Sequence, residues 1–343
     1  ITINEYALRT GTAFTEGTSA SQDAIKSAAN WINLEGSSST GSVHPYELMN
    51  IDKVHSFTDG TNNLTGVGQV IHIADFNCDD SHEIYNNKTI YNLDNGGVGE
   101  STFGAAGSSI SDSHCQFVAN MAAGDSNSDV VGVAPDADLV LSSIPNTEGT
   151  FSMDDYARDL DSARGYGAVV SNNSWALTDI AYTSHYDASE FQTFYDANKD
   201  SYTLDQLAGY QFENGSLSSA QTSSFQQYIT ALDNFQNSGV IVFANGNYYN
   251  DSNSSAIASL PVWYNGGTDG LGNSVEDLSD AWITVLYANF KGTSLDGATT
   301  ADFERKGNIC GSTKEYCLTV DDFRLKGASY VSGGVSQYDD NGS

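Results

Sequence analysis

Residues 65 to 75 read Thr-Gly-Val-Gly-Gln-Val-Ile-His-Ile-Ala-Asp, and much of the fold can be inferred by working outward from them. The two glycines mark a turn, and the short apolar run from Val70 to Ala74 is typical of a buried strand. Asp75 then places a carboxylate directly after that strand. Such an Asp on its own more often belongs to a turn or caps a helix, so its meaning depends on what surrounds it.

Outside this stretch, apolar runs alternate with segments of helical spacing. We expect helices over residues 21–34, 114–123, 154–165 and 218–236. We expect further strands over residues 138–142, 168–171, 239–244 and 282–287. Nearly all-apolar strands separated by helices predict an α/β fold with a parallel sheet covered on both faces.

Polar residues follow several of these strands directly, as in Asp75, Asn173–Trp175 and Asn245–Asn247. Sites in parallel sheets form where loops leave the carboxyl ends of the strands. Asn247 follows a glycine, which permits a tight turn that exposes the amide, and such an amide can donate to a developing oxyanion. His114 opens a predicted helix, where either Asp112 or Ser113 could be the cap. The positive end of a helix dipole should lower the pKa of His114, which suits a general base.

Composition restricts the partners of the chain. The 343 residues are 39% hydrophobic, enough for a core, and carry 13 Lys and Arg against 44 Asp and Glu, a net charge of −31. This charge argues against nucleic acid and against anionic membranes as partners. The acidity has two interpretations, namely solvation, which we favour, and a structural Ca²⁺ bound by carboxylates and carbonyls. No apolar run is long enough to cross a membrane, and the first residues do not have the pattern of a signal peptide.

The cysteines point to an exported protein. Cys310 and Cys317 enclose a short loop, the form of a local disulfide, which favours a secreted or cell-surface location. No CxxC pair occurs and no His lies near this loop, so a zinc site is not expected.

Taken together, four segments resemble the subtilisin-like (subtilase) family, peptidase family S8. The segments, in order, are residues 65–75, His114-Cys-Gln-Phe-Val-Ala-Asn-Met-Ala-Ala123, Gly132-Val-Ala-Pro-Asp-Ala-Asp-Leu139 and Val240-Ile-Val-Phe-Ala-Asn-Gly-Asn247. The resemblance implies a three-layer fold whose mostly parallel central sheet is flanked by helices. The cysteine loop looks most like that of the autotransporter-type members.

The resemblance also implies roles. Asp75 would orient His114, which would take the proton of a serine hydroxyl, and Asn247 would donate to the oxyanion. The segment Ser174-Trp175-Ala176 would pair with an extended protein or peptide substrate. Trp175 would shape a subsite or, on the other reading, belong to the core. The chemistry would require no cofactor.

The nucleophile is harder to place, because the family writes it Gly-Thr-Ser-Met-Ala-x-Pro. Gly292-Thr-Ser294 matches three letters, but no proline follows and it precedes the cysteine loop. The alternatives are Ser343 or the residue after it. We therefore expect an N-terminal extension over residues 1–55 that packs on a catalytic domain over residues 56–343, which stops at or just before the serine helix. An anchor or a cleaved part could follow.

Some positions depart from the family pattern. Cys115, Gln116 and Asn120 replace small residues after His114. On this resemblance Cys78 and Cys115 lie close to the two triad members, so either they form a disulfide that braces the pair or they are two buried thiols. A catalytically degenerate subtilase fold, used as a cell-surface or filament subunit, is the alternative to a protease. We favour the protease, because a scaffold has no need for Asp75, His114 and Asn247 together.

Overall fold

A computed structural model describes residues 14–34, 44–76, 78, 80–93, 114–144, 152–176, 186–212, 215, 217–248, 251–292, 296–321, 325–332 and 335–340. Its centre is an eight-stranded sheet with the order β2-β3-β1-β4-β5-β6-β7, in which β8 also pairs with β6. The strands are β1 (Val70–Phe76), β2 (Ile90–Leu93), β3 (Asp138–Ile144), β4 (Ala168–Asn173), β5 (Val240–Ala244), β6 (Trp282–Phe290), β7 (Phe303–Arg305) and β8 (Cys317–Asp321). Every pairing is parallel except that of β7 with β6, so the predicted sheet is confirmed.

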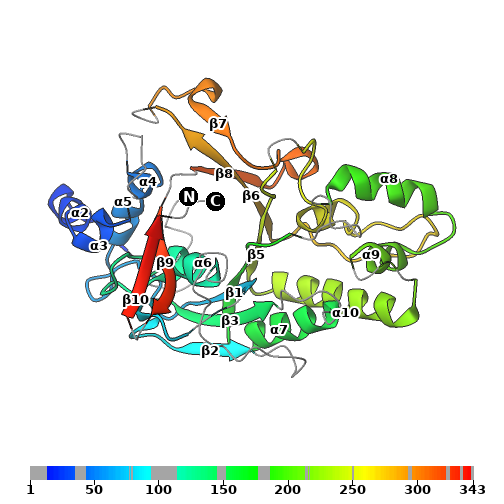
Figure 1. Cartoon of the computed structure of the whole chain (residues 1–343), viewed down its shortest axis with the longest axis horizontal. Coiled ribbons are helices and arrows are strands. Elements are labelled where there is room, and N and C mark those ends of the chain that lie inside the picture. Colours follow the sequence, from blue (N-terminus) through cyan, green and yellow to red (C-terminus); the bar gives the residue numbers. More distant parts are fainter. Residues whose placement is uncertain are drawn as a thin grey trace.

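Helices cover both faces of this sheet (Figure 1). Ile73 of β1 shares a buried cluster with α6 (His114–Ala123) on one face. Its neighbour Ala74 shares another cluster with α7 (Met153–Gly165) and α10 (Ser219–Gln236) on the opposite face. Successive strand residues point to opposite faces, so one cluster lies between the sheet and α6, and the other lies between the sheet and the helices α7 and α10. The fold therefore has three layers.

The long helix α10 forms where the apolar spacing placed it. Its inward residues recur at helical intervals and are at most 2% exposed, namely Phe225, Tyr228, Ile229, Leu232 and Phe235. The hydroxyl of Ser218 caps the helix by accepting from the Gln221 backbone N–H. Two further helices, α8 (Ala188–Asn198) and α9 (Leu204–Phe212), contribute Phe191 and Phe212 to the same core.

The N-terminal helix was expected to be continuous over residues 21–34, and this was wrong. The structure has α2 (Ser19–Lys26) and α3 (Ala29–Ile32), separated by Ala28 in an extended conformation. The Ser27 hydroxyl donates to the Ala24 carbonyl at 2.9 Å, a local bond that competes with helix continuation.

Two more short helices, α4 (Pro45–Leu48) and α5 (Ile51–Ser56), complete the N-terminal part. Trp31 and Tyr46 from this part pack with Val130 and Val131 in one buried cluster. The division of domains at residue 55 stays a prediction. None of the described helices is both long and apolar enough to cross a membrane.

A hairpin of β9 (Lys326–Ser332) and β10 (Val335–Asp340) was not anticipated. It forms a separate two-stranded sheet that lies against α6 (Figure 1). A Cβ atom on Gly327 would come within 2.5 Å of the Phe117 ring, so only glycine allows this close approach. The remaining elements are short 3-10 helices: η1 (Glu83–Tyr85), η3 (Ile257–Val262), η4 (Thr300–Asp302) and η5 (Gly311–Thr313).

Candidate active site

Asp75 and His114, which are far apart in sequence, meet in the structure. His114 Nδ1 lies 2.7 Å from Asp75 Oδ1. A carboxylate can only accept, so Nδ1–H is the donor and the other ring nitrogen, Nε2, remains available. The Asp75 side chain is fully buried, whereas that of His114 is 37% exposed. The pair therefore has a fixed inner partner and an imidazole that reaches the surface.

The local fold explains this meeting. Asp75 lies near the end of β1, and His114 is the first residue of α6, which covers the face to which Asp75 points. Burial by itself lowers the pKa of His114, but the hydrogen bond and the negative charge of Asp75 outweigh it, and the pKa is raised above its ordinary value. The lowered pKa expected from the helix dipole was wrong, because a buried carboxylate in direct contact dominates.

A disulfide runs beside this pair. Cys78 and Cys115 are bonded, and both are buried. Cys115 directly follows His114, and Cys78 lies shortly after Asp75. Of the two alternatives in the sequence, the disulfide is the one that the structure contains. The disulfide therefore joins the same two segments that the Asp75–His114 hydrogen bond joins.

The strand register brings further residues to the same edge of the sheet. Ala74 of β1 pairs with Asn173 of β4, and Asn173 pairs with Phe243 of β5. Because the three strands are parallel, the loops at their carboxyl ends all emerge at one edge. Ser174 and Asn247 are therefore on the edge where Asp75 lies.

Asn247 is exposed in a turn that follows β5. Gly246 precedes it with a φ of 115°, where a Cβ atom would come within 2.5 Å of the Asn308 side chain. Asn308 is completely buried, accepts from the Tyr248 backbone N–H at 2.8 Å and donates to Asp251 and to the Asn253 carbonyl. Sequence reasoning missed Asn308, which holds the turn in place.

Asn245 is a second buried support of this turn, a role that its place in the sequence does not reveal. Its amide donates to the Ile309 carbonyl at 2.7 Å and accepts from the Thr313 hydroxyl at 3.3 Å. Ile309 directly precedes the Cys310–Cys317 disulfide, which the structure contains as expected, and Thr313 lies within its loop. The cysteine loop therefore helps to anchor the turn that carries Asn247.

The segment Ser174-Trp175-Ala176 follows β4 directly. The Ser174 hydroxyl accepts from the Asn172 amide at 3.0 Å. Trp175 is 4% exposed, stacks on Tyr156 with ring centroids 4.7 Å apart, and its indole N–H donates to Asn173. Of the two interpretations of Trp175, the structure shows the core residue, so its side chain does not form a subsite at the surface.

A second histidine contacts serines, but it does not form a comparable site. His72 is 2% exposed within β1, and its ring nitrogens lie 3.0 Å from the Ser171 hydroxyl and 2.7 Å from the Ser142 hydroxyl. Burial lowers its pKa to about 3. By strand alternation His72 faces away from the Asp75 side of the sheet. The two serine hydroxyls satisfy the hydrogen-bonding nitrogens of this imidazole, which is buried where a substrate could not reach it.

The remaining predicted residues cannot be placed. Ser343 and Ser294 both lie outside the described residues. Within the part of the chain that the structure describes, no three His, Cys, Asp or Glu side chains are grouped so as to hold a metal ion.

An α/β fold whose parallel sheet carries an Asp–His pair at its carboxyl edge is the framework of one class of serine proteases. The sequence agrees. The model of the subtilase family, Peptidase_S8, matches residues 66–321, which is most of the chain. The chain therefore belongs to the subtilase family of serine proteases.

Several solved structures are similar to the chain. They include the protease domain of PatA, at 16% identity over 79% of this chain and 74% of that chain, with a TM-score of 0.47. The PatG macrocyclase in complex with peptide has 14% identity over 82% and 72%, with a TM-score of 0.49. Fervidolysin from Fervidobacterium pennivorans, a keratinolytic enzyme related to subtilisin, has 16% identity over 94% and 41%, with a TM-score of 0.48. Similarity at this level adds nothing to the family match, and no curated protein matches the sequence.

Proposed function

We propose that this subtilase is an exported endopeptidase that uses Asp75, His114 and a serine at or directly after position 343. The observation that carries the proposal is the 2.7 Å contact between a fully buried Asp75 carboxylate and the partly exposed His114 ring. A buried carboxylate that fixes one tautomer of an imidazole is what a general base needs, and a protein scaffold has no use for it.

In the proposed reaction His114 Nε2 takes the serine proton as the hydroxyl oxygen bonds to the substrate carbonyl carbon. The imidazolium that forms is stabilised by Asp75, and it then protonates the leaving amine. Water hydrolyses the acyl-enzyme in the second half by the same proton transfers. The raised pKa of His114 is consistent with this role, because it reflects a carboxylate that favours the imidazolium.

Two other segments would complete the site. The Asn247 side chain is exposed at the correct edge of the sheet and would donate to the oxyanion, supported by the buried Asn308. The backbone of residues 174–176, which continues β4, would add an extended substrate as a further strand. The substrate would thus be recognised largely through its main chain.

The location and the ions are further parts of the proposal. Two disulfides are formed in the structure, and such bonds persist in oxidising compartments, which supports a secreted or cell-surface protein. A structural Ca²⁺ remains a prediction from the acidity alone. A fall in melting temperature on adding a chelator, reversed by Ca²⁺ but not by Mg²⁺, would support it.

Labelling of the full-length protein with a fluorophosphonate tests the proposed chemistry directly. We expect one serine to be labelled, and His114→Ala to abolish the labelling. His72→Gln is the matched control, because it removes the other serine-contacting histidine and should leave a folded protein labelled. A folded protein that takes no label would instead support the alternative, a degenerate subtilase fold that serves as a surface or filament subunit.

A further inference from the structure

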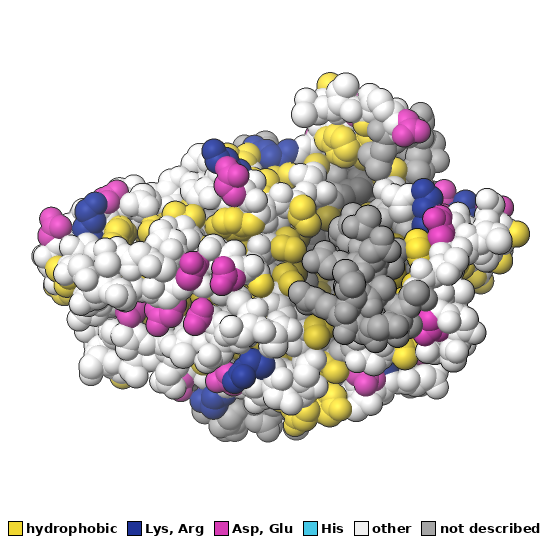
Figure 2. Space-filling view, turned by 180° about the vertical axis from the view of Figure 1, so that it is seen from behind, with side chains coloured by type: hydrophobic (Ala, Val, Ile, Leu, Met, Phe, Trp, Pro, Cys, Tyr) yellow, Lys and Arg dark blue, Asp and Glu magenta, His cyan; other side chains and the backbone are white. Residues whose placement is uncertain are grey.

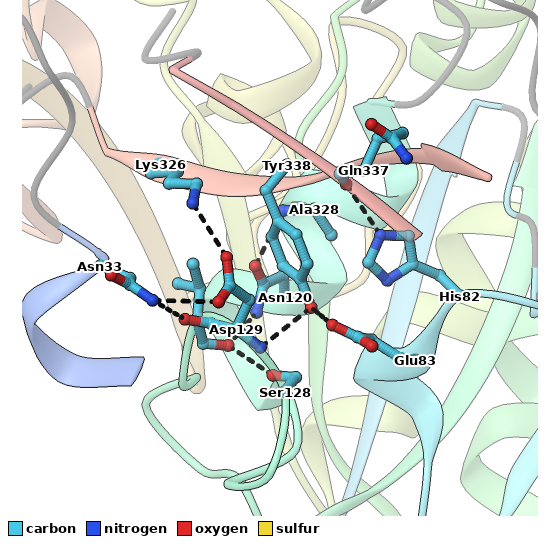
Figure 3. A network of polar contacts seen from close by, with 11 residues as sticks. Asn33, His82, Glu83, Asn120, Ser128, Asp129, Lys326, Ala328, Gln337 and Tyr338 are labelled. Carbon is cyan, nitrogen blue, oxygen red and sulfur yellow. Dashed lines mark hydrogen bonds and ion pairs between the residues drawn. The ribbon is translucent and has the colours of Figure 1, made fainter. Parts of the chain in front are cut away.

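The β9–β10 hairpin is attached to the part of the molecule that carries Asp75 and His114. The Lys326 backbone N–H donates to the Leu34 carbonyl at 3.0 Å, and side chains provide the other bonds, which Figure 3 shows. In the described part of the chain, its two strands hydrogen-bond to each other and neither belongs to the eight-stranded sheet. Its position relative to α6 therefore depends on packing and on bonds that come from outside the hairpin.

Asn120 makes a hydrogen bond from α6 to the hairpin itself. It lies on α6, less than two turns after His114, and its side chain is completely buried. The amide oxygen accepts from the Ala328 backbone N–H of β9 at 2.8 Å, and the amide nitrogen donates to the Val130 carbonyl at 2.9 Å. One side chain thus joins the helix of His114, the loop after it and the hairpin. In the subtilase pattern this position is a glycine, which could make neither bond.

Other contacts hold the hairpin to the same region along both of its strands. Lys326 of β9 forms an ion pair with Asp129 at 2.9 Å. The Tyr338 hydroxyl of β10 donates to Glu83 at 2.7 Å and accepts from the Asp129 backbone N–H at 3.3 Å. His82 contacts the Gln337 carbonyl at 2.9 Å. Figure 3 shows these side chains converging on the hairpin from different segments.

We infer that Asn120 is a positioning residue for the nucleophile, an inference that rests on the proposed function. β10 ends at Asp340, and Ser343 follows three residues later. Three residues of chain span at most about 11 Å, so the position of the hairpin end limits how far away the proposed serine can be. By tying β9 to the helix that begins with His114, Asn120 would restrict the distance between the base and this serine.

The test uses the full-length protein and the rate constant of fluorophosphonate labelling between pH 5 and 9. Asn120→Ala should lower the plateau of this profile about 10- to 100-fold, the loss expected when a reacting atom is displaced by up to about 1 Å. The midpoint of the profile should stay where it is in the wild type, because the Asp75–His114 bond is not changed. A shifted midpoint would mean that α6 itself has been disturbed, and it would overturn the inference.

Gln236→Ala is the matched control. Its side-chain amide also donates to one backbone carbonyl, that of Asp277 at 3.0 Å, and accepts from one backbone N–H, that of Ala281 at 2.9 Å. It joins the end of α10 to the segment before β6, at the opposite edge of the sheet. Both variants should lose thermal stability, but only Asn120→Ala should lose labelling rate. An equal loss of rate in both variants would overturn the inference.

Tyr338→Phe provides a milder second variant, should Asn120→Ala not fold. It removes the bonds of the hydroxyl and keeps the ring, and we expect the plateau to fall about three- to tenfold. A plateau equal to that of the wild type in every folded hairpin variant would overturn the positioning role while leaving the proposed protease intact. A wild type that takes no label would overturn both.

Discussion

Asp75 is the residue on which the proposed chemistry depends, because it holds His114 in one tautomer and raises its pKa. Asp75→Asn retains the size of the side chain but removes its charge and its fixed acceptor role. We expect the rate of peptide hydrolysis to fall about 10⁴-fold, the loss that follows when the aspartate of such a triad is replaced by asparagine. Steady-state assays with a casein substrate would measure it, and a loss below tenfold would contradict the assignment.

The raised pKa of His114 has a definite sign in a pH profile. The base must be unprotonated, so the wild-type rate should rise with pH through a midpoint above the ordinary value of about 6.5. Asp75→Asn removes the cause that raises the pKa and leaves burial, which lowers it. The residual activity of this variant should therefore have its midpoint at lower pH than the wild type. A midpoint displaced upward would be inconsistent with the pair.

His72 should make the free energy of unfolding depend on pH. The pKa of His114 is raised, whereas that of His72 is lowered. Its pKa is about 3 in the folded protein, because burial lowers it, whereas in the unfolded chain it is about 6.5. Between these values the unfolded state binds an extra proton, so stability is complete above pH 6.5 and falls as the pH decreases. The slope approaches about 1.4 kcal/mol per pH unit.

Urea unfolding at pH 6 and pH 4 would measure this effect as the difference between the wild type and His72→Gln. The wild type should lose more free energy of unfolding over this interval than the variant does. Equal losses in the two proteins would show that His72 is not held neutral.

A site residue could be predicted where the sequence directly around it has a recognisable pattern. Asp75 and His114 could be placed because each adjoins an element with a clear pattern. Asn308 could not, since its partners Tyr248, Asp251 and Asn253 come from a distant loop and only the folded chain brings them together. The role of Trp175 was ambiguous, because the periodicity of apolar residues predicts burial in helices and strands but not in a loop.

At the scale of elements, the Cys78–Cys115 disulfide joins the segment after β1 to the first turn of α6. The cysteines are 37 residues apart, a loop whose closure in the unfolded state corresponds to about 4 kcal/mol of stabilisation. The Cys310–Cys317 bond closes a loop of 7 residues and corresponds to about 2 kcal/mol. We expect the double variant Cys78→Ser/Cys115→Ser to be the less stable of the two double-serine variants in denaturant titrations. The reverse order would contradict this account.

The elements that were predicted correctly are those whose pattern is long and internally consistent. β1, β5 and α10 are continuous apolar or periodic segments, and the structure has them within a few residues of their expected bounds. The β9–β10 hairpin was missed because its sequence is mostly small and polar, so neither alternation nor an apolar run reveals it. The two strands pair with each other and are held by bonds to α6 and to the loop after it, which only the folded chain brings together.

At the scale of the whole molecule, the net charge of −31 is the dominant feature. Figure 2 shows acidic side chains spread over one face of the protein among uncharged ones. Like charges in this number repel one another and oppose the compact state, and salt screens the repulsion. The Debye length falls from about 30 Å at 0.01 M to about 3 Å at 1 M ionic strength.

The melting temperature should therefore rise by several degrees between low salt and about 0.5 M NaCl, a range over which this repulsion becomes screened. Differential scanning fluorimetry would follow the change, with an equally concentrated uncharged osmolyte as the control. A melting temperature that falls with NaCl would mean that ion pairs outweigh the net charge.

The β9–β10 hairpin lies outside the main sheet, and this has a consequence for how the molecule opens. A two-stranded ladder is marginally stable by itself, and β9 and β10 depend on their bonds to α6 and to the loop after it, so they should open locally before β1, β3 and β4 do. Amide deuterium uptake should thus be faster in residues 326–340 than in residues 70–76. On the proposed function, the strand that leads to the serine would then open more often than the strand that holds Asp75, the partner of the base.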